Sequence, residues 1–295
     1  MTTLSPSVPA PNGSNPRAEL HCHTTASDGY YSPAELVRVA RLRDLRVIAI
    51  TDHDTIDGHA EALAAGSAEG VTVIPGIEIS SLSSQGEVHV LGYGVRPIDE
   101  VTRQQITGLR SSRESRARRI LANLERLGKP VRFERVKELA GDAMIGRPYI
   151  AAAMVEAGHV QTRQQAFDEY LAEGKPAFAP NDALTPAEAV DLIHHAGGVA
   201  VIAHPALYKG DLMAVFEDMV AHGLDGIEVY YPLHTPEQSE AFAALARKHN
   251  LLITGGSDFH SPARDTELAL GSIQLPPGTL DVLLSRIAAT RASLA

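Results

Sequence analysis

The chain has 295 residues, 44% of them hydrophobic, and a formal net charge of −10 at pH 7. This hydrophobic fraction is typical of a globular protein, and the acidic charge argues against stable binding to duplex nucleic acid, which requires a basic surface. No stretch approaches the roughly 18 apolar residues of a membrane span. Because the single cysteine excludes an internal disulfide, we expect a cytoplasmic protein without membrane contact.

Residues 1–16 differ in composition from the rest of the chain. They are rich in Pro, Ser, Thr and Asn and lack the apolar centre of a signal peptide. A segment with so few apolar side chains cannot offset the entropy of ordering, so we predict a disordered tail. A targeting role is the alternative.

Seven short segments are rich in aliphatic and β-branched residues. Most are nearly continuous apolar runs, which is typical of strands buried on both faces of a parallel sheet. The segments are residues 17–22, 46–51, 71–77, 87–92, 198–203, 226–230 and 251–255. They predict a parallel sheet at the centre of the protein.

Helix-start signals lie between several of these segments. Ser32, Thr185 and Thr235 are each followed by proline, so that a good N-cap precedes a residue suited to the first helical turn. Alternating strands and helices predict an α/β fold.

Residues 97–183 interrupt this alternation. They are charged and helical in pattern, and their most basic stretch, Arg113–Arg119, is typical of a solvated helix face. We interpret the region as a helical insertion, or cap subdomain. The main domain would then consist of residues 17–96 and 184–295.

Histidines and carboxylates gather in or just after the apolar segments. They are His21, His23, Asp28, Asp52, His53, Asp54, Glu78, His89, His204, Asp258 and His260. Imidazoles and carboxylates bind hard and borderline metals, and the carboxyl ends of barrel strands converge on one face. Alternate residues of a strand share a side, so His21 and His23 could face one metal while Cys22, between them, would be a small buried residue. The sequence therefore predicts a polynuclear metal centre and an enzyme.

These motifs resemble those of the PHP family (polymerase and histidinol phosphatase) of metal-dependent phosphoesterases. The resemblance covers residues 17–275, with the motifs in the family's order: HCHTTASDG, ITDHDT, GIEIS, HVLGYG, IAHP and GSDFH. It implies a distorted seven-stranded (β/α)7 barrel, in agreement with the strand count above. It also implies three divalent ions, with manganese expected first and iron, zinc or magnesium as alternatives.

Nine positions resemble the family's metal ligands. The three sets are His21, His23, Glu78 and Asp258; Glu78, His89 and His204, with Glu78 bridging the first two ions; and Asp28, His53 and His260. No ligand position is visibly missing.

The expected chemistry is hydrolysis of a phosphate ester. Divalent metals activate water and neutralise phosphoryl oxygens. Glu78 and His260 are candidate catalytic residues, because Glu78 would bridge two ions and His260 would hold the third. Asp52 and Asp54 flank His53, where either could orient an imidazole N–H or be a surface acid. We include Asp54 among the catalytic candidates.

Within the family, the match is best to the group that acts on nucleoside 3′,5′-bisphosphates and short RNA 5′ ends. The segment Gly146–Ala151 looks like that group's signature, although Tyr149 stands where histidine is usual. Arg147 is a candidate for binding a second phosphate, because guanidinium matches phosphate oxygens. A structural ion pair within the cap is the alternative.

Three further residues are candidates for contact with a substrate, against the alternative of a surface or capping position. They are Lys175, Arg264 and His234. We thus expect a phosphatase or a 5′-to-3′ exoribonuclease acting on a small phosphorylated nucleotide, with short RNA 5′ ends as a further substrate. The alternatives are a histidinol-phosphate phosphatase and a non-catalytic PHP-type module that serves a partner. The intact ligand set argues against the module.

Overall fold

A computed structural model describes residues 17–96, 99–140, 145–179, 184–262 and 269–293, without the side chains of residues 110–113. The predicted tail, residues 1–16, lies outside this range. Seven strands form one sheet in chain order: β1 (Ala18–Cys22), β2 (Val47–Ile50), β3 (Thr72–Ser83), β4 (Gly86–Tyr93), β5 (Val199–Ile202), β6 (Gly226–Tyr230) and β7 (Leu252–Gly255). Apart from β3, which continues six residues further, these bounds lie within one residue of those predicted.

The sheet is not parallel throughout. β1, β2 and β3 pair in parallel, as do β5, β6 and β7, whereas β4 is antiparallel to both β3 and β5. Only Ser84 and Gln85 separate β3 from β4, and so short a connection can join only antiparallel strands. The prediction of a parallel sheet is therefore wrong for β4.

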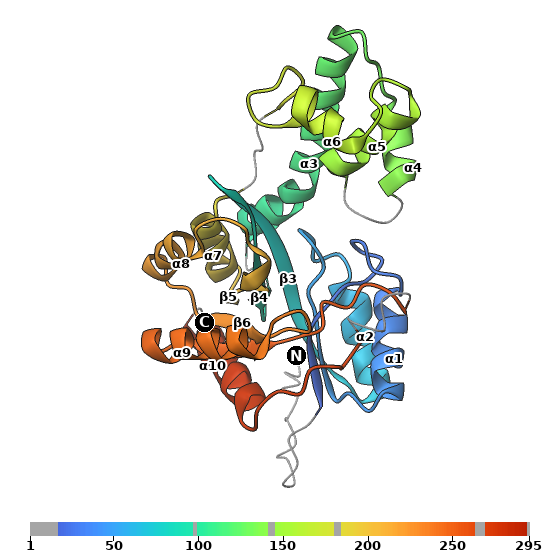
Figure 1. Ribbon diagram of the computed structural model, residues 1–295. Coiled ribbons are helices and arrows are strands. Elements are labelled where there is room, and N and C mark those ends of the chain that lie inside the picture. Colours follow the sequence, from blue (N-terminus) through green and yellow to red (C-terminus); the bar gives the residue numbers. More distant parts are fainter. Residues whose placement is uncertain (1–16, 97–98, 141–144, 180–183, 263–268, 294–295) are drawn as a thin grey trace.

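The sheet curls until its two edge strands approach each other (Figure 1). Cys22 at the end of β1 forms an isolated parallel bridge with Phe259, just after β7, and His23 N donates to Phe259 O at 2.9 Å. Cys22 itself is buried, as predicted. The result is a half-barrel that confirms the α/β expectation and brings the two ends of the sheet to one site.

Helices cover the outside of the curled sheet (Figure 1). They are α1 (Pro33–Leu42), α2 (His59–Glu69), α7 (Pro186–His195), α8 (Leu212–Ala221), α9 (Pro236–His249) and α10 (Thr279–Ser293), with a short 3₁₀ turn at Pro205–Leu207. Ser32, Thr185 and Thr235 cap α1, α7 and α9 through reciprocal side-chain and backbone hydrogen bonds, as their sequence signals predicted. No helix in the described ranges is long and apolar enough to cross a membrane.

The charged region contains the predicted helices, above the sheet in Figure 1. They are α3 (Glu100–Arg126), α4 (Phe133–Ala140), α5 (Arg147–Glu156), α6 (Arg163–Ala166) and a π-helical turn at Phe167–Leu171. Buried side chains such as Leu124, Ile150 and Met154 form an apolar cluster within this region, separate from the clusters around the sheet. The exact limits of a cap subdomain stay a prediction.

Candidate metal centre

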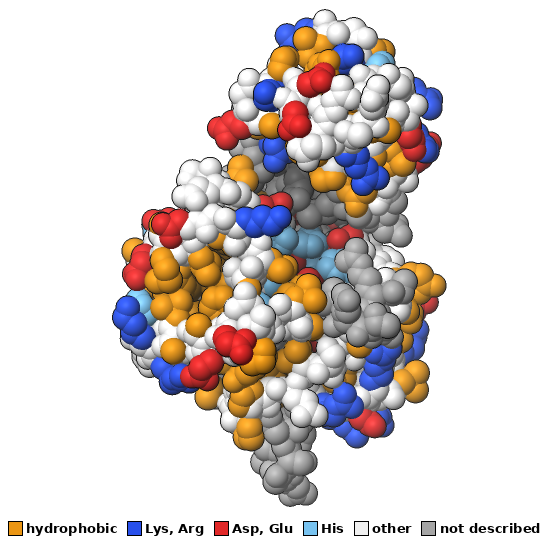
Figure 2. Space-filling view, in the orientation of Figure 1, with side chains coloured by type: hydrophobic (Ala, Val, Ile, Leu, Met, Phe, Trp, Pro, Cys, Tyr) orange, Lys and Arg blue, Asp and Glu red, His pale blue; other side chains and the backbone are white. Residues whose placement is uncertain are grey.

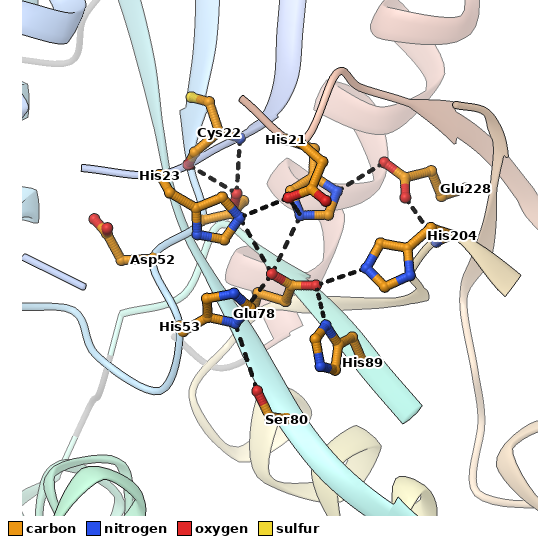
Figure 3. Close-up of polar contacts among 12 residues, drawn as sticks. His21, Cys22, His23, Asp52, His53, Glu78, Ser80, His89, His204 and Glu228 are labelled. Carbon is orange, nitrogen blue, oxygen red and sulfur yellow. Dashed lines mark hydrogen bonds and ion pairs between the residues drawn. The ribbon is translucent and has the colours of Figure 1, made fainter. Parts of the chain in front are cut away.

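Glu78 lies at the centre of a cluster of imidazoles (Figure 3). Glu78 is fully buried. It lies inside β3, because that strand continues beyond its predicted end at residue 77. Its Oε1 accepts from His89 Nδ1 at 2.8 Å and lies 3.1 Å from His204 Nε2. Its Oε2 lies 3.2–3.3 Å from three other ring nitrogens: His21 Nε2, His23 Nε2 and His53 Nδ1. The two oxygens of one carboxylate therefore face different sets of imidazoles.

One group that could hold a metal ion consists of His21, His23, Glu78 and Asp258. His21 and His23 reach the same side because they are alternate positions at the end of β1. Asp258 follows β7, and its Oδ1 lies 3.1 Å from His23 Nε2 and 3.4 Å from His21 Nε2. These are the four residues predicted for the first ion.

A second group combines Asp28, His53 and His260 with His23. Asp28 Oδ2 lies 3.3 Å from His260 Nε2 and 3.9 Å from His53 Nε2. The first three residues were predicted to meet, whereas the participation of His23 was not.

A third group consists of His53, Glu78 and His89, and His204 adjoins it through Glu78 Oε1. His53 thus belongs to two groups, although the sequence assigned it to one ion. All nine predicted positions meet in one place, while the distribution of residues among ions stays a prediction. In the space-filling view, histidine side chains gather in a hollow below the α3–α6 helices (Figure 2).

Three polar atoms of this cluster are buried without a hydrogen-bond partner. They are His21 Nε2, His23 Nδ1 and Glu78 Oε2. A buried polar atom without a partner costs free energy, roughly 1–3 kcal/mol. Since lone pairs of imidazole and carboxylate are the donors that divalent metals use, these side chains fit a bound cation.

Burial and neighbouring charges shift the pKa values of the cluster in opposite directions. Burial lowers the pKa of His23 and His89, but hydrogen bonds and the charge of Glu78 outweigh it and raise each pKa to about 10. Burial dominates at His53 and lowers its pKa to about 3. The pKa of Glu78 is held well below its usual range by the surrounding histidines, despite burial. Without metal, protons on His23 and His89 would therefore balance the carboxylates.

The backbone at the site adopts unusual conformations. Asp54, His204 and Asp258 have φ angles of 51°, 26° and 54°. Positive φ is unfavourable for residues with a Cβ atom and persists where surrounding contacts determine it. At His204 such a contact is the hydrogen bond from its backbone N to Glu228 Oε2, at 2.7 Å.

Asp52 holds a loop and does not orient an imidazole. Its carboxylate accepts from Thr24 N and Thr24 Oγ1, both at 2.7 Å, and from Ser27 Oγ at 2.6 Å. It is 1% exposed, so both earlier interpretations of Asp52 are wrong. By these bonds it fixes the loop that carries Asp28. Asp54 Oδ1 accepts from Ser80 N at 2.9 Å, and its catalytic role stays a prediction.

Two buried carboxylates beside the cluster were given no role by the sequence analysis. Glu19 accepts hydrogen bonds from His21 N, Ser257 and Gly271 N, and so joins β1 to the segment after β7. Glu228 in β6 bonds His21 Nδ1 and His204 N. A glutamate inside an apolar strand indicates a buried carboxylate with hydrogen-bond partners, because burying an unpartnered charge is costly.

Comparison with known proteins agrees with this geometry. Residues 19–144 match the sequence model of the PHP domain. The chain is 36% identical over 267 residues to the 5′-3′ exoribonuclease Rnm of Salmonella typhimurium. The aligned region covers 88% of this chain and 90% of the relative. The chain belongs to the PHP family.

Other PHP relatives extend the comparison. The chain is 34% identical over 263 residues to a 3′,5′-nucleoside bisphosphate phosphatase of Chromobacterium violaceum, with 88% of this chain and 92% of the relative covered. A solved structure from Bifidobacterium adolescentis, described as a metal-dependent phosphoesterase, has a TM-score of 0.70 and 32% identity over 91% of this chain and 96% of that one. These findings confirm the expected fold and identify this PHP protein as a metal-dependent phosphoesterase.

The residues predicted to bind substrate are not part of the metal cluster. Arg147, the first residue of α5, donates to Leu171 O at 3.5 Å and lies over the ring of Phe167. The predicted alternative, an ion pair with an acid of the cap, is not found for Arg147 among the residues described. Lys175 is exposed.

The third candidate, His234, lies among aromatic side chains. His234 packs between the rings of Tyr231 and Phe242, at 5.2 and 5.1 Å, and its Nδ1 donates to Val229 O. Arg264 lies outside the described residues. For all four candidates, contact with a substrate stays a prediction.

Proposed function

We propose that this PHP protein hydrolyses a phosphate monoester of small nucleotides, with nucleoside 3′,5′-bisphosphates as the preferred class and the 5′ ends of short RNA as a further substrate. The observation that carries the proposal is the gathering of nine histidines and carboxylates in one cluster centred on the buried Glu78. The chain is also similar over most of its length to enzymes named for these two activities. The single cysteine supports a cytoplasmic location.

The proposal includes three divalent ions, manganese first among them, at the residue sets predicted above. When bound, such ions would activate a water nucleophile and neutralise the charge of the phosphoryl group. Glu78 supports a shared position for two of them, since its two oxygens face separate imidazoles.

The protein's own side chains would fix the geometry of the reacting group. Asp28 and His260, whose Oδ2 and Nε2 atoms lie 3.3 Å apart, would lie on one side of Glu78. His89 and His204 would stand on the other, both within 3.1 Å of Glu78 Oε1. A phosphate ester held between these two sides would meet ligands that are already in place, because Glu78 is fully buried and cannot reorient freely.

Recognition of a second phosphate requires donors outside the cluster. Arg147 is the proposed donor, because its guanidinium has only a long hydrogen bond to a carbonyl and a ring contact among the described residues. A guanidinium without a carboxylate partner keeps its capacity to bind phosphate in a bidentate manner.

The test is a comparison of substrates with manganese-loaded protein. We expect kcat/KM for adenosine 3′,5′-bisphosphate to exceed that for adenosine 3′-monophosphate, for adenosine 5′-monophosphate and for histidinol phosphate, with release of nucleoside 5′-monophosphates also from a short 5′-phosphorylated RNA. Protein shown to be metal-free by elemental analysis should be inactive. A preference for histidinol phosphate would favour that alternative, and the absence of hydrolysis on all substrates would favour a non-catalytic module.

A further inference from the structure

Glu228 connects two parts of the metal cluster that come from different strands. Its side chain is fully buried in β6. Oε1 lies 2.9 Å from Nδ1 of His21, in β1, and Oε2 accepts from the backbone N of His204, after β5, at 2.7 Å (Figure 3). Each oxygen of one carboxylate thus holds a different candidate ligand.

The contact with His21 determines which ring nitrogen is available to a cation. Nε2 of His21 faces the cluster, 3.3 Å from Glu78 Oε2 and 3.4 Å from Asp258 Oδ1. A carboxylate oxygen can only accept, so the nitrogen that faces Glu228 must carry a hydrogen. Once Nε2 binds a metal, the remaining hydrogen is therefore on Nδ1, where Glu228 also fixes the plane of the ring.

The contact with His204 acts on the backbone. His204 has a φ of 26°, which a residue with a Cβ atom adopts only when its surroundings impose it. Its N–H can only donate, and Glu228 Oε2 is the acceptor. The bond holds the turn that aims the ring of His204 at Glu78 Oε1.

We propose that Glu228 is a positioning residue that couples two metal positions, by fixing the hydrogen on His21 and the backbone turn at His204. The inference rests on the proposed function, in which His21 and His204 hold the two ions that share Glu78. Loss of Glu228 should therefore weaken both positions together and leave the position formed by Asp28, His53 and His260 in place.

Replacement by glutamine tests this idea with little change in volume. Both partners of Glu228 are donors, whereas an amide offers one accepting oxygen and one NH₂ group that donates. In Glu228→Gln, one of the two partners must face a donor. The variant removes either the orientation of His21 or the support of His204.

The same strand offers a matched control. Asp225, immediately before β6, also accepts from a histidine, His194 Nε2 at 2.8 Å, and from a backbone N–H, that of Ala200, at 2.9 Å. It also pairs with Arg286, and neither His194 nor Arg286 belongs to the metal cluster. Asp225→Asn thus replaces another hydrogen-bonded carboxylate by its amide, just before β6 and away from the metal cluster.

The experiment measures binding of Mn²⁺ to the full chain by calorimetry, and bound metal by elemental analysis after dialysis. We expect Glu228→Gln to lose at least one ion, or to bind it about 10- to 100-fold more weakly, because one of the two donors loses its acceptor. Asp225→Asn should bind as the wild type does. Metal binding by Glu228→Gln equal to that of wild type would overturn the inference while leaving the proposed function intact. Failure of the wild type to bind Mn²⁺ would instead overturn the proposed function.

A second measurement on the wild type keeps the inference testable if Glu228→Gln does not fold. In the zinc-loaded protein, ¹⁵N NMR of the histidine rings should show His21 with hydrogen on Nδ1, protected from exchange, and a metal-bound Nε2. A His21 ring with its hydrogen on Nε2 would refute the proposed role of Glu228.

Discussion

His53 and Glu78 face each other across an isolated parallel bridge, with His53 Nδ1 3.2 Å from Glu78 Oε2. Backbone hydrogen bonds on both sides maintain the bridge: Asp54 N donates to Glu78 O at 3.0 Å, and Glu78 N donates to Asp52 O at 3.1 Å. The loop after β2 is therefore attached to the middle of β3. The relative position of His53 and Glu78 is thus set by main-chain contacts and should survive the loss of either side chain.

Glu78→Gln should bind less metal and turn over more slowly without loss of fold. The amide removes the negative charge that faces five imidazoles, and its NH₂ group cannot bind a cation. We expect kcat to fall by about 10²-fold or more. Steady-state kinetics with elemental analysis checks this, with Glu240→Gln as control because Glu240 pairs with Arg247 on the surface. Wild-type turnover with unchanged metal content would remove Glu78 from the mechanism.

His260→Ala should impair turnover strongly while leaving the protein folded. His260 Nε2 lies 3.3 Å from Asp28 Oδ2, so its loss would open the position proposed for the third ion. We expect a decrease in kcat of about 10²-fold. His222→Ala is the control, because His222 is a surface histidine bonded to Asp191. Equal kinetics for both variants would exclude His260 from the site.

Metal binding should release protons. In the metal-free protein the pKa of His23 and of His89 is about 10, so both rings are charged at neutral pH, whereas a metal binds the neutral ring. Affinity for Mn²⁺ should therefore fall as the pH is lowered. Calorimetry in two buffers of different ionisation enthalpy counts the protons released at about pH 7.5. An affinity independent of pH between about 6 and 9 would contradict this assignment.

The strands and the gathering of the histidines and carboxylates could be predicted from the sequence, because the strands and motifs are local signals. Apolar runs mark buried strands, and the residues of the metal cluster lie in or next to them. The direction of β4 could not be predicted once β3 was ended at residue 77. Placing the end at Ser83 leaves a two-residue connection, and only then does the sequence require an antiparallel pair.

The carboxylates that support the cluster could not be assigned because their roles depend on contacts distant in sequence. Glu228 bonds His21 across 207 positions, and Asp52 bonds Thr24 across 28. Nothing in the neighbourhood of Asp52 distinguishes an acid that bonds an imidazole from one that bonds a loop. Fold and ligand types are thus encoded locally, whereas the supporting contacts require the closed sheet.

Arg147→Ala should change which substrate the enzyme prefers. The metal cluster can closely hold only the phosphoryl group that is cleaved, so the second phosphate of a bisphosphate needs a separate donor. A hydrogen bond to a charged group contributes about 1.5–3 kcal/mol, or about 10- to 150-fold in kcat/KM. We expect that loss for adenosine 3′,5′-bisphosphate and little change for the adenosine monophosphate, 3′ or 5′, that the enzyme hydrolyses.

The measurement compares kcat/KM for adenosine 3′,5′-bisphosphate and for the 3′- and 5′-monophosphates of adenosine in wild type, Arg147→Ala and Arg135→Ala. Arg135 is the matched control, because it lies in the same helical region but is paired with Glu156 and Glu138 at 2.7 Å. A charge already engaged by two carboxylates offers little to a phosphate, so Arg135→Ala should keep the wild-type preference. Equal fractional losses on the bisphosphate and the monophosphate in Arg147→Ala would mean that Arg147 supports the helices around Phe167 and Leu171, and that another donor selects the bisphosphate.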